Sequence, residues 1–413
     1  MADFRNQEGI EALQKKFLGF IVIRPTEPKI IGRSVLSPKI KKERDIAICT
    51  VNVSTTVDCI KFHVEGFPHS SQDTETITCA ETTIWALMEY FSHKYPEYKP
   101  VLPANITETL SLVSSERQIP STGLDIQQIS FALKAFGFGT RIYSAKEFRR
   151  EFYKLLSCYV ESGIPIVIAI ENDEEKRIGH AVLCVGHKKI EHNQVENLVE
   201  EIIRDETARI DLLKREISIY DYDNLNKEFV FVDDNMPVFQ KALLAEPAKY
   251  YEDPDWGKCK ITHFVVPLYP KNYLEAYEAK NFIQNFLSKK FLPIPDNTKL
   301  FVRTFLASGR SYKNAIALDP DISEDIRTLI CETAMPKFIW VTELATKDLI
   351  KIEKAEGLVI LDATEARVTH LKPLLLAAYE NSVLYYDSEN KVFAKNNIPL
   401  SRFGTYKNNL IRF

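Results

Sequence analysis

The clearest pattern in the chain is a run of apolar residues at helical spacing over residues 80–91. Apolar side chains recur there every three or four positions, so the pattern predicts a helix that buries one face. Thr78 and Glu81 stand at its start as Thr-x-x-Glu, a pattern in which both side chains bind free backbone N–H groups of the first turn. Cys79 lies between them, in the first turn of the predicted helix.

Elsewhere the pattern alternates between short continuous apolar runs, which predict buried strands, and amphipathic stretches, which predict helices. Prolines and glycines separate these segments. The predicted strands are 20–23, 45–51, 60–64, 164–170, 179–187, 217–220, 229–232, 261–268, 300–305, 338–341 and 358–361, with a hairpin of 382–386 and 391–394; the further predicted helices are 6–17, one that closes at Gly137, 146–162, 271–289 and 321–332.

The order of these segments divides the chain into three parts. Residues 1–66 form a small β-rich unit, residues 67–268 a central core, and residues 269–413 a separate α+β domain. Within the core, residues 188–216 are highly charged and carry a sparse apolar stripe, which predicts a solvated helical insertion. Ile202 lies in that stripe. The predicted fold class is α+β.

Composition excludes several classes of protein. A net charge of −4 with mixed signs gives no general attraction to nucleic acid or to anionic membranes. No apolar run is long enough to span a membrane, and the opening residues lack the basic-then-apolar order of a signal peptide. The seven cysteines are odd in number and form no Cys-x-x-Cys pair, which argues against a disulfide framework and a thiolate zinc site. We therefore expect a cytoplasmic protein with reduced thiols and with no metal or cofactor.

The position of Cys79 suggests a nucleophile. Free N–H groups and the positive end of the helix dipole stabilise a thiolate at a helix start. A thiol enzyme also needs a base, a group that orients the base and donors for the oxyanion. His180 at the start of a predicted strand is the candidate base, Asp233 or Asp234 at the end of a later strand the candidate orienting group, and Gln72, seven positions before the cysteine, the candidate oxyanion donor.

Two points stay open on the residues alone. Asp223 also follows a predicted strand and competes with the adjacent pair Asp233 and Asp234 for the orienting role. His187 lies seven residues after His180, and an odd step along a regular strand changes the face, so we interpret it as a surface residue at the strand end.

These residues resemble the papain-like cysteine peptidases, and within them the bacterial branch that includes the bacteriocin-processing, leader-cleaving peptidases. The resemblance covers residues 67–268, about half of the chain. Here the glutamine-to-cysteine gap is seven residues rather than the six usual in that family, and 53 residues separate His180 from Asp233. The segments that carry the resemblance are Gln72…Cys79-Ala80, the turn Gly123-Leu124, Gly163-Ile164-Pro165 and Gly179-His180-Ala181-Val182-Leu183-Cys184-Val185-Gly186.

The resemblance implies a fold and a reaction. A central helix headed by the nucleophile would pack on an antiparallel sheet, and Cys79, His180, Asp233 and Gln72 would act as nucleophile, base, orienting residue and oxyanion donor. The substrate would be a peptide or protein, cleaved through a thioester, and the C-terminal domain could contact a protein partner. Two alternatives share the same residues: an acyl transferase of the transglutaminase type, and a catalytically silent binding module that keeps the fold.

Overall fold

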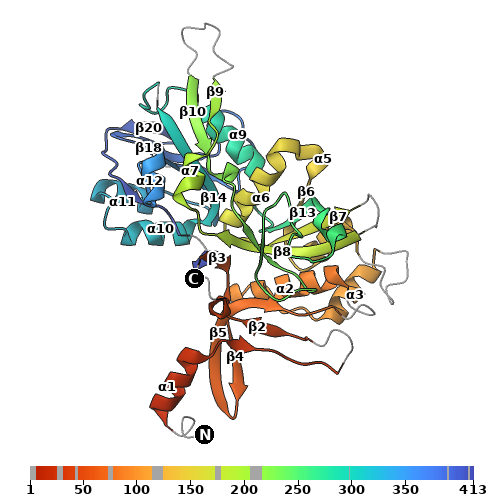
Figure 1. Ribbon diagram of the computed structural model, residues 1–413. Helices are drawn as coiled ribbons and strands as arrows, with labels where there is room; N and C mark the ends of the chain where they lie inside the picture. The colour runs from red at the N-terminus through yellow and green to blue at the C-terminus, as the bar shows by residue number, and fades with distance from the viewer. Residues whose placement is uncertain are drawn as a thin grey trace.

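The computed structural model describes residues 6–25, 31–41, 45–72, 78–113, 124–172, 178–204, 216–296, 298–387, 390–407 and 410–413. Helices and mainly antiparallel sheets both contribute substantially, so the predicted α+β class is confirmed (Figure 1). Within the described residues, no helix is both long and apolar enough to cross a membrane.

The N-terminal unit is a four-stranded antiparallel sheet with helix α1, and the apolar runs did not predict its strand β2. Its strand order is β1-β2-β5-β4, and the unit extends away from the rest of the molecule (Figure 1). One strand of this region, β3, leaves the unit and pairs with β8 of the central core. The elements are α1 (Gln7–Lys16), β1 (Gly19–Phe20), β2 (Ser34–Leu36), η2 (Pro38–Ile40), β3 (Ile46–Cys49), β4 (Val51–Val57) and β5 (Ile60–His69).

The central core is an antiparallel sheet of order β12-β11-β8-β7-β13-β6, extended by β3 on β8 and β22 on β3. Helix α2 packs on one face of this sheet together with α3 and α4, and their apolar side chains form one continuous core. The elements are α2 (Cys79–Lys94), α3 (Pro103–Ser111), α4 (Ile126–Ala135), β6 (Gly139–Ser144), β7 (Ile166–Asn172), β8 (Ile178–Lys188), β11 (Phe229–Val232), β12 (Gln240–Ala242), α8 (Pro254–Gly257), β13 (Lys260–Leu268) and β22 (Leu410–Arg412).

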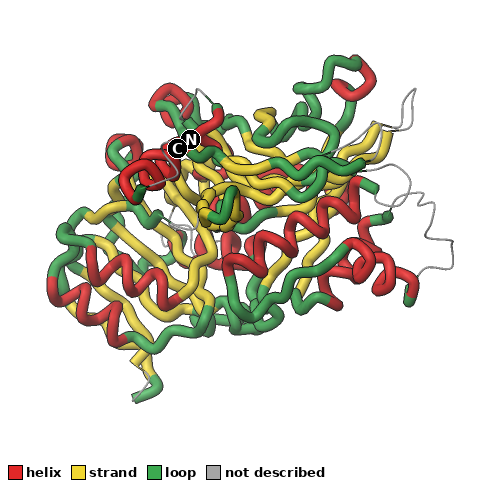
Figure 2. The backbone as a smooth tube through the Cα atoms, turned by 90° about the horizontal axis from the view of Figure 1, so that it is seen from below, coloured by secondary structure: helices red, strands yellow, loops and turns green. Residues whose placement is uncertain are grey.

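A second eight-stranded sheet has the order β20-β19-β18-β17-β15-β14-β10-β9, and only its β10–β14 pair is parallel. Helices α6 and α9 fill the space between the two sheets, while α10 and α11 cover the outer face of the second sheet (Figure 2). The elements are α5 (Ala145–Phe148), η3 (Arg149–Glu151), α6 (Phe152–Glu161), β10 (Glu216–Asp221), η5 (Tyr222–Asn224), α9 (Ala276–Leu287), β14 (Lys299–Ser308), α10 (Gly309–Leu318), α11 (Glu324–Glu332), β15 (Phe338–Ala345), α12 (Lys347–Lys351), β16 (Lys354–Ala355), β17 (Gly357–Asp362), β18 (Leu374–Tyr379), β19 (Ser382–Asp387), β20 (Val392–Asn396) and β21 (Phe403–Gly404).

The helical insertion predicted over residues 188–216 is wrong for its described part beyond α7 (His192–Glu196). Residues Glu201–Arg204 form strand β9, which pairs antiparallel with β10. Ile203 is buried and Ile202 is 55% exposed, the alternation of a strand. Two adjacent apolar residues are compatible with both the helical and the strand period, so the sequence pattern could not distinguish a helix from a strand here. The rest of the expected stripe, within residues 205–215, lies outside the described residues.

The two large sheets do not divide at residue 268, the predicted boundary between the core and the C-terminal domain, because each sheet contains strands from both sides of it. Strands β9 and β10 precede that point but belong to the second sheet, and β22 at the end of the chain belongs to the core sheet. The predicted helix over 146–162 is also broken, because Arg149 adopts a φ of 46° between α5 and α6. The three-domain division itself stays a prediction.

Candidate active site

Helix α2 begins at Cys79, as its capping pattern predicted. The backbone N–H of Thr78 donates to Glu81 Oε2 at 3.1 Å, and the buried Glu81 thereby closes the helix start. One turn on, the hydroxyl of Thr83 donates to the carbonyl of Ala181 at 3.1 Å. This bond ties the first turns of α2 to strand β8, beside the predicted base. Cys79 itself is half-buried.

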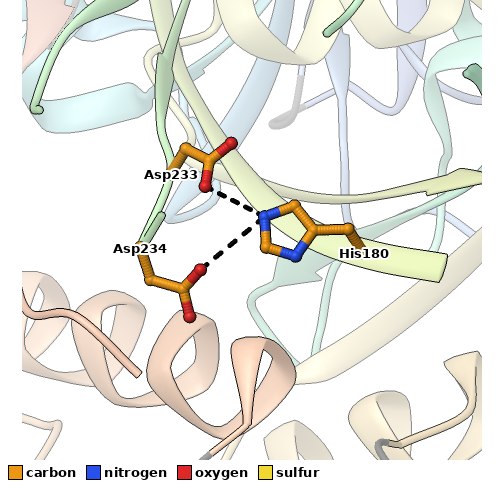
Figure 3. Close-up of side chains that lie close together, drawn as sticks. All are labelled: His180, Asp233 and Asp234. Atoms are coloured by element: carbon orange, nitrogen blue, oxygen red, sulfur yellow. Dashed lines mark hydrogen bonds and ion pairs between the residues drawn. The ribbon is translucent and has the colours of Figure 1, made fainter. Parts of the chain in front are cut away.

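His180, the third residue of β8, is buried and lies beside two carboxylates. Its Nε2 donates to Asp233 Oδ1 at 2.9 Å and lies 3.6 Å from Asp234 Oδ1 (Figure 3). A carboxylate can only accept, so the proton of this bond belongs to Nε2. The Cys79 thiol is a further neighbour of the imidazole and raises its pKa. In Figure 3 the second ring nitrogen faces the pale orange helix, and no dashed line joins it to either carboxylate.

The charges of this pair reinforce one another. Burial lowers the pKa of His180, but the negative charge and hydrogen bond of Asp233, together with the contact with Cys79, raise that pKa well above its ordinary value. Burial raises the pKa of Asp233. The charge and hydrogen bond of His180 lower it by more, so the pKa of Asp233 lies below its ordinary value. Both shifts favour an imidazolium paired with a carboxylate.

Asp233 is held by more donors than the sequence analysis anticipated. The phenolic hydroxyls of Tyr250 and Tyr251 donate to its Oδ2 at 2.9 and 2.8 Å, and the backbone N–H of Asn235 donates to its Oδ1 at 2.9 Å. A ring nitrogen of His69 lies 3.2 Å from its carbonyl oxygen. The carboxylate is completely buried, and these bonds fix its orientation toward His180. Neither tyrosine carries a sequence signal, because both lie in a loop without a motif.

An aromatic wall stands beside the imidazole. The ring of Trp256, in α8, meets the ring of His180 edge-on, with centroids 5.3 Å apart and an interplanar angle of 83°. Tyr251 stacks on Trp256 at a centroid distance of 3.9 Å. The same tyrosine therefore orients the carboxylate through its hydroxyl and supports the tryptophan through its ring.

Gln72 joins the site through Asn235. Its Nε2 donates to Asn235 Oδ1 at 2.7 Å, and Asn235 Nδ2 lies 3.5 Å from His180 Nε2. The structure thus places Gln72 within the cluster, while its oxyanion role stays a prediction. Residues 73–77, between Gln72 and the helix, and Gly123 of the predicted turn lie outside the described residues.

The structure separates the three aspartates that competed for the orienting role. Asp233 hydrogen-bonds to His180 and Asp234 lies next to the ring. Asp223 lies in η5 and accepts a hydrogen bond from Lys280 Nζ at 2.6 Å. Its carboxylate forms a buried ion pair with Lys280 and does not contact His180. The geometry therefore favours Asp233 as the residue that orients the imidazole.

His180, Asp233 and Asp234 could each offer one metal-ligand atom, since these atoms lie within 4.8 Å of one another. Nitrogen and carboxylate oxygens are suitable ligands for several divalent ions. Protein groups alone already account for this contact, because a hydrogen bond joins His180 Nε2 to Asp233 Oδ1 at 2.9 Å. Both oxygens of Asp233 also already accept protein hydrogen bonds. Hydrogen bonding explains the cluster better than ligation.

Burial disfavours the thiolate at four of the cysteines. It raises the pKa of Cys49 to about 12 and raises the pKa values of Cys158, Cys184 and Cys259. A protonated thiol is a poor nucleophile. Cys79 differs from these four in having the imidazole of His180 as a neighbour.

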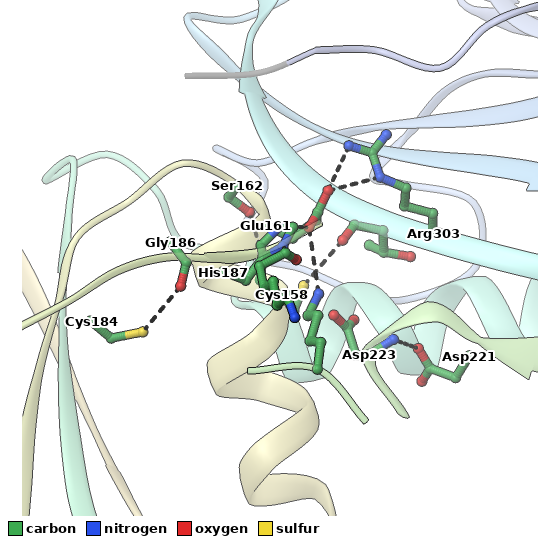
Figure 4. Close-up of polar contacts among 12 residues, drawn as sticks. Cys158, Glu161, Ser162, Cys184, Gly186, His187, Asp221, Asp223 and Arg303 are labelled. Atoms are coloured by element: carbon green, nitrogen blue, oxygen red, sulfur yellow. Dashed lines mark hydrogen bonds and ion pairs between the residues drawn. The ribbon is translucent and has the colours of Figure 1, made fainter. Parts of the chain in front are cut away.

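His187 is buried, which corrects its interpretation as a surface residue. Its Nε2 lies 3.0 Å from Glu161 Oε2, at the end of α6 (Figure 4). The cause is a bulge in β8: Cys184 pairs with Phe231 and Gly186 with Val230, so Val185 is an extra residue. The bulge shifts the alternation by one and puts His187 on the face of Cys184, where a regular strand would have turned it away.

Neither a scan against protein-family models nor a search of curated proteins found a match for this chain.

Proposed function

We propose that this protein is a cysteine peptidase that hydrolyses a peptide or isopeptide bond through a thioester acyl-enzyme. The observation that supports it is one imidazole, that of His180, which hydrogen-bonds to the Asp233 carboxylate and whose pKa the neighbouring Cys79 thiol raises. A thiol, an imidazole and a carboxylate that meet in this way support the roles of nucleophile, base and orienting group. The cysteine also occupies the first position of a capped helix.

The reaction would use these groups in turn. Cys79 passes its proton to the free ring nitrogen of His180, and the sulfur attacks the carbonyl carbon of the substrate. The tetrahedral intermediate collapses, the C–N bond breaks, and His180 returns the proton to the leaving amine. A water molecule then gives a proton to His180 and attacks the thioester, the C–S bond breaks, and the sulfur regains its proton. Asp233 keeps the ring oriented and its positive charge stabilised throughout.

The arrangement of elements is consistent with a papain-like core. A helix headed by the cysteine packs on an antiparallel sheet, and the histidine and aspartate lie on two neighbouring strands of that sheet or directly after them. We propose the papain-like family on this basis and on the motifs around Cys79 and His180. A peptide or protein substrate and a reducing, cytoplasmic setting belong to the same proposal, as does a protein partner for the C-terminal region.

Selective alkylation tests the proposal without knowledge of the substrate. Full-length protein is treated with substoichiometric iodoacetamide, and the modified cysteines are mapped by peptide mass spectrometry. We expect Cys79 to react roughly tenfold or more faster than the exposed Cys59, because a thiolate is the reactive form and His180 is positioned to take its proton. His180→Gln should remove this advantage.

Two controls make the result interpretable. Cys331→Ser changes another half-buried thiol and should leave the rate at Cys79 unaltered. Equal rates at Cys79 and Cys59 in the folded wild-type protein would refute the thiol-enzyme proposal and favour a silent binding module. If a peptide substrate is found, product formed with added amine in place of water would indicate acyl transfer.

A further inference from the structure

Strand β1 of the N-terminal sheet continues into a run of exposed apolar side chains. Ile21, Val22 and Ile23 are 49%, 44% and 63% exposed. Successive side chains of an extended chain point to opposite faces, so this run presents apolar groups on both of its faces. Single exposed apolar residues are common, but a contiguous group of them marks an interaction site. We call residues 21–23 the apolar edge.

The backbone of the apolar edge has unpaired groups on its outer side. Within the described residues, β1 is the last strand of its sheet. The Val22 carbonyl accepts from the Gly32 N–H at 2.8 Å, and the Val22 N–H donates to the Ser34 hydroxyl at 3.2 Å, so both groups face inward. The backbone groups of Ile21 and Ile23 alternate with these and hydrogen-bond to no residue that the structure describes. An edge of this kind can take up a further strand.

Hydrogen bonds tie the apolar edge to the segment that carries Gln72. Ile23 pairs with Ile31, whose carbonyl accepts from the backbone N–H of Ser71 at 2.9 Å. The guanidinium of Arg24 also donates to the Ser71 carbonyl at 2.8 Å. Neighbouring strands lie about 4.8 Å apart, so a strand added outside Ile23 would lie about 15 Å from Ser71. Ser71 directly precedes Gln72, and an extended peptide covers that distance with about five residues.

We propose that the apolar edge binds an extended, apolar segment of the substrate polypeptide, which adds to β1 as a further strand. The inference rests on the proposed peptidase function, because its occupant is the substrate of that activity. The added strand would hydrogen-bond to the outward backbone groups, and its alternate side chains would pack on Ile21 and Ile23. The next residues of the same chain would then reach the site at Cys79. The substrate class is therefore an unfolded or flexible polypeptide with apolar segments.

Fluorescence anisotropy tests the binding with full-length Cys79→Ala protein, in which no turnover can intervene. The probe is fluorescein-labelled α-lactalbumin, reduced and carboxymethylated so that it stays unfolded, and the same protein in its native form is the folded control. We expect saturable binding of the unfolded form only, and at least about tenfold weaker binding when Ile23→Glu is added, because a charge replaces the apolar contact. Ile202→Glu, 55% exposed on the edge strand β9 of the second sheet, is the matched control and should bind the probe undiminished.

Protection of Cys79 tests the link between the edge and the active site. In the wild-type protein, unfolded α-lactalbumin at ten times its dissociation constant should slow the iodoacetamide reaction of Cys79 on the order of tenfold and leave that of Cys331 unaltered. The two proposals can fail separately. If Cys79 reacts no faster than Cys59 without the probe, the peptidase proposal fails. If Cys79 is reactive but the bound probe does not protect it, the inference about the edge fails.

Melting temperatures show which variants are folded, and Ile21→Glu is the second variant should Ile23→Glu unfold. Equal binding of native and unfolded α-lactalbumin, no saturable binding, or undiminished binding in either folded variant would overturn the inference. Sedimentation velocity of the protein alone checks one other occupant. A dimer that Ile23→Glu dissociates would mean that a second copy of this chain covers the edge, and would overturn the inference as well.

Discussion

His180 and His187 lie on the same strand, and both are buried beside a carboxylate, at 2.9 and 3.0 Å. They differ in what their other ring nitrogen meets. Nδ1 of His187 hydrogen-bonds to the carbonyl of Lys188 at 2.7 Å, so both its nitrogens are engaged by fixed protein groups. His180 binds Asp233 through Nε2 and has a half-buried thiol, that of Cys79, as a neighbour that raises its pKa. Histidine and carboxylate together therefore do not define a reactive site; the partner of the second nitrogen does.

The surroundings of the two histidines differ in the same sense. Glu161, the partner of His187, also binds Arg303 at 2.7 Å, and Arg303 reaches Glu343 at 2.6 Å (Figure 4). Burial raises the pKa of Glu161, but the charge of Arg303 and its other cationic neighbours holds that pKa well below its ordinary value. Arg303 comes from β14 of the second sheet and His187 from β8 of the core sheet, and Glu161 of α6 contacts both, so the cluster joins the two sheets. We interpret it as structural.

The largest expected effect is on this structural cluster. Arg303→Met would leave Glu161 and Glu343 buried without their main counter-charge, and breaking a buried ion pair in this way costs about 3–5 kcal/mol. Urea denaturation should show this loss in the free energy of unfolding. Lys249→Met, which breaks an exposed pair with Glu246, is the control and should unfold like the wild type. An Arg303→Met variant of wild-type stability would contradict the structural interpretation.

The next effect concerns the reactive cluster. Asp233→Asn keeps an oxygen that can accept from His180 but removes the negative charge that stabilises an imidazolium. We expect the alkylation rate of Cys79 to fall on the order of 100-fold, the scale of general base catalysis, with little change in the unfolding midpoint. Asp234→Asn is the matched control and should have a smaller effect, since Asp234 lies 3.6 Å from the ring. The reverse ranking would make Asp234 the orienting residue.

The protonation of His180 gives a third measurement. Because Asp233 and Cys79 raise its pKa, the titration midpoint of its ring, followed by NMR, should lie above the ordinary value of 6.5. Asp233→Asn should move the midpoint down, since burial, which lowers the pKa, would remain while the main opposing charge is lost. In the wild type the imidazolium should accordingly persist to higher pH than in the variant. An unchanged midpoint would mean that the two groups are not coupled.

The smallest effect is expected for the other histidine. His187→Gln retains a donor for Glu161, so it should lower the free energy of unfolding by only about 1 kcal/mol. It should leave the alkylation rate of Cys79 unaltered, in contrast with His180→Gln. This pair of identical substitutions on one strand tests the comparison directly. A loss of Cys79 reactivity in both variants would show that the two clusters are not separate.

Local features of the chain could be predicted because they depend on neighbours in sequence. The start of α2 at Cys79 follows from Thr78 and Glu81, which bind backbone groups within one turn. The strands around His180 and before Asp233 follow from short apolar runs with polar borders. The order of cysteine, histidine and aspartate pointed to a thiol site, and the structure brings the three together.

The tertiary structure decided what depends on distant segments. It put Asp233 against His180 and Asp223 against Lys280 of α9. It brought Tyr250 and Tyr251 onto Asp233 from a loop without a motif, and a bulge in β8 turned His187 inward. Helix capping and apolar periodicity depend on residues within one or two turns of backbone, so they can be predicted from the sequence. Register, ion pairs and buried partners arise only when separate elements pack, because their energies depend on which groups meet and on the water excluded between them.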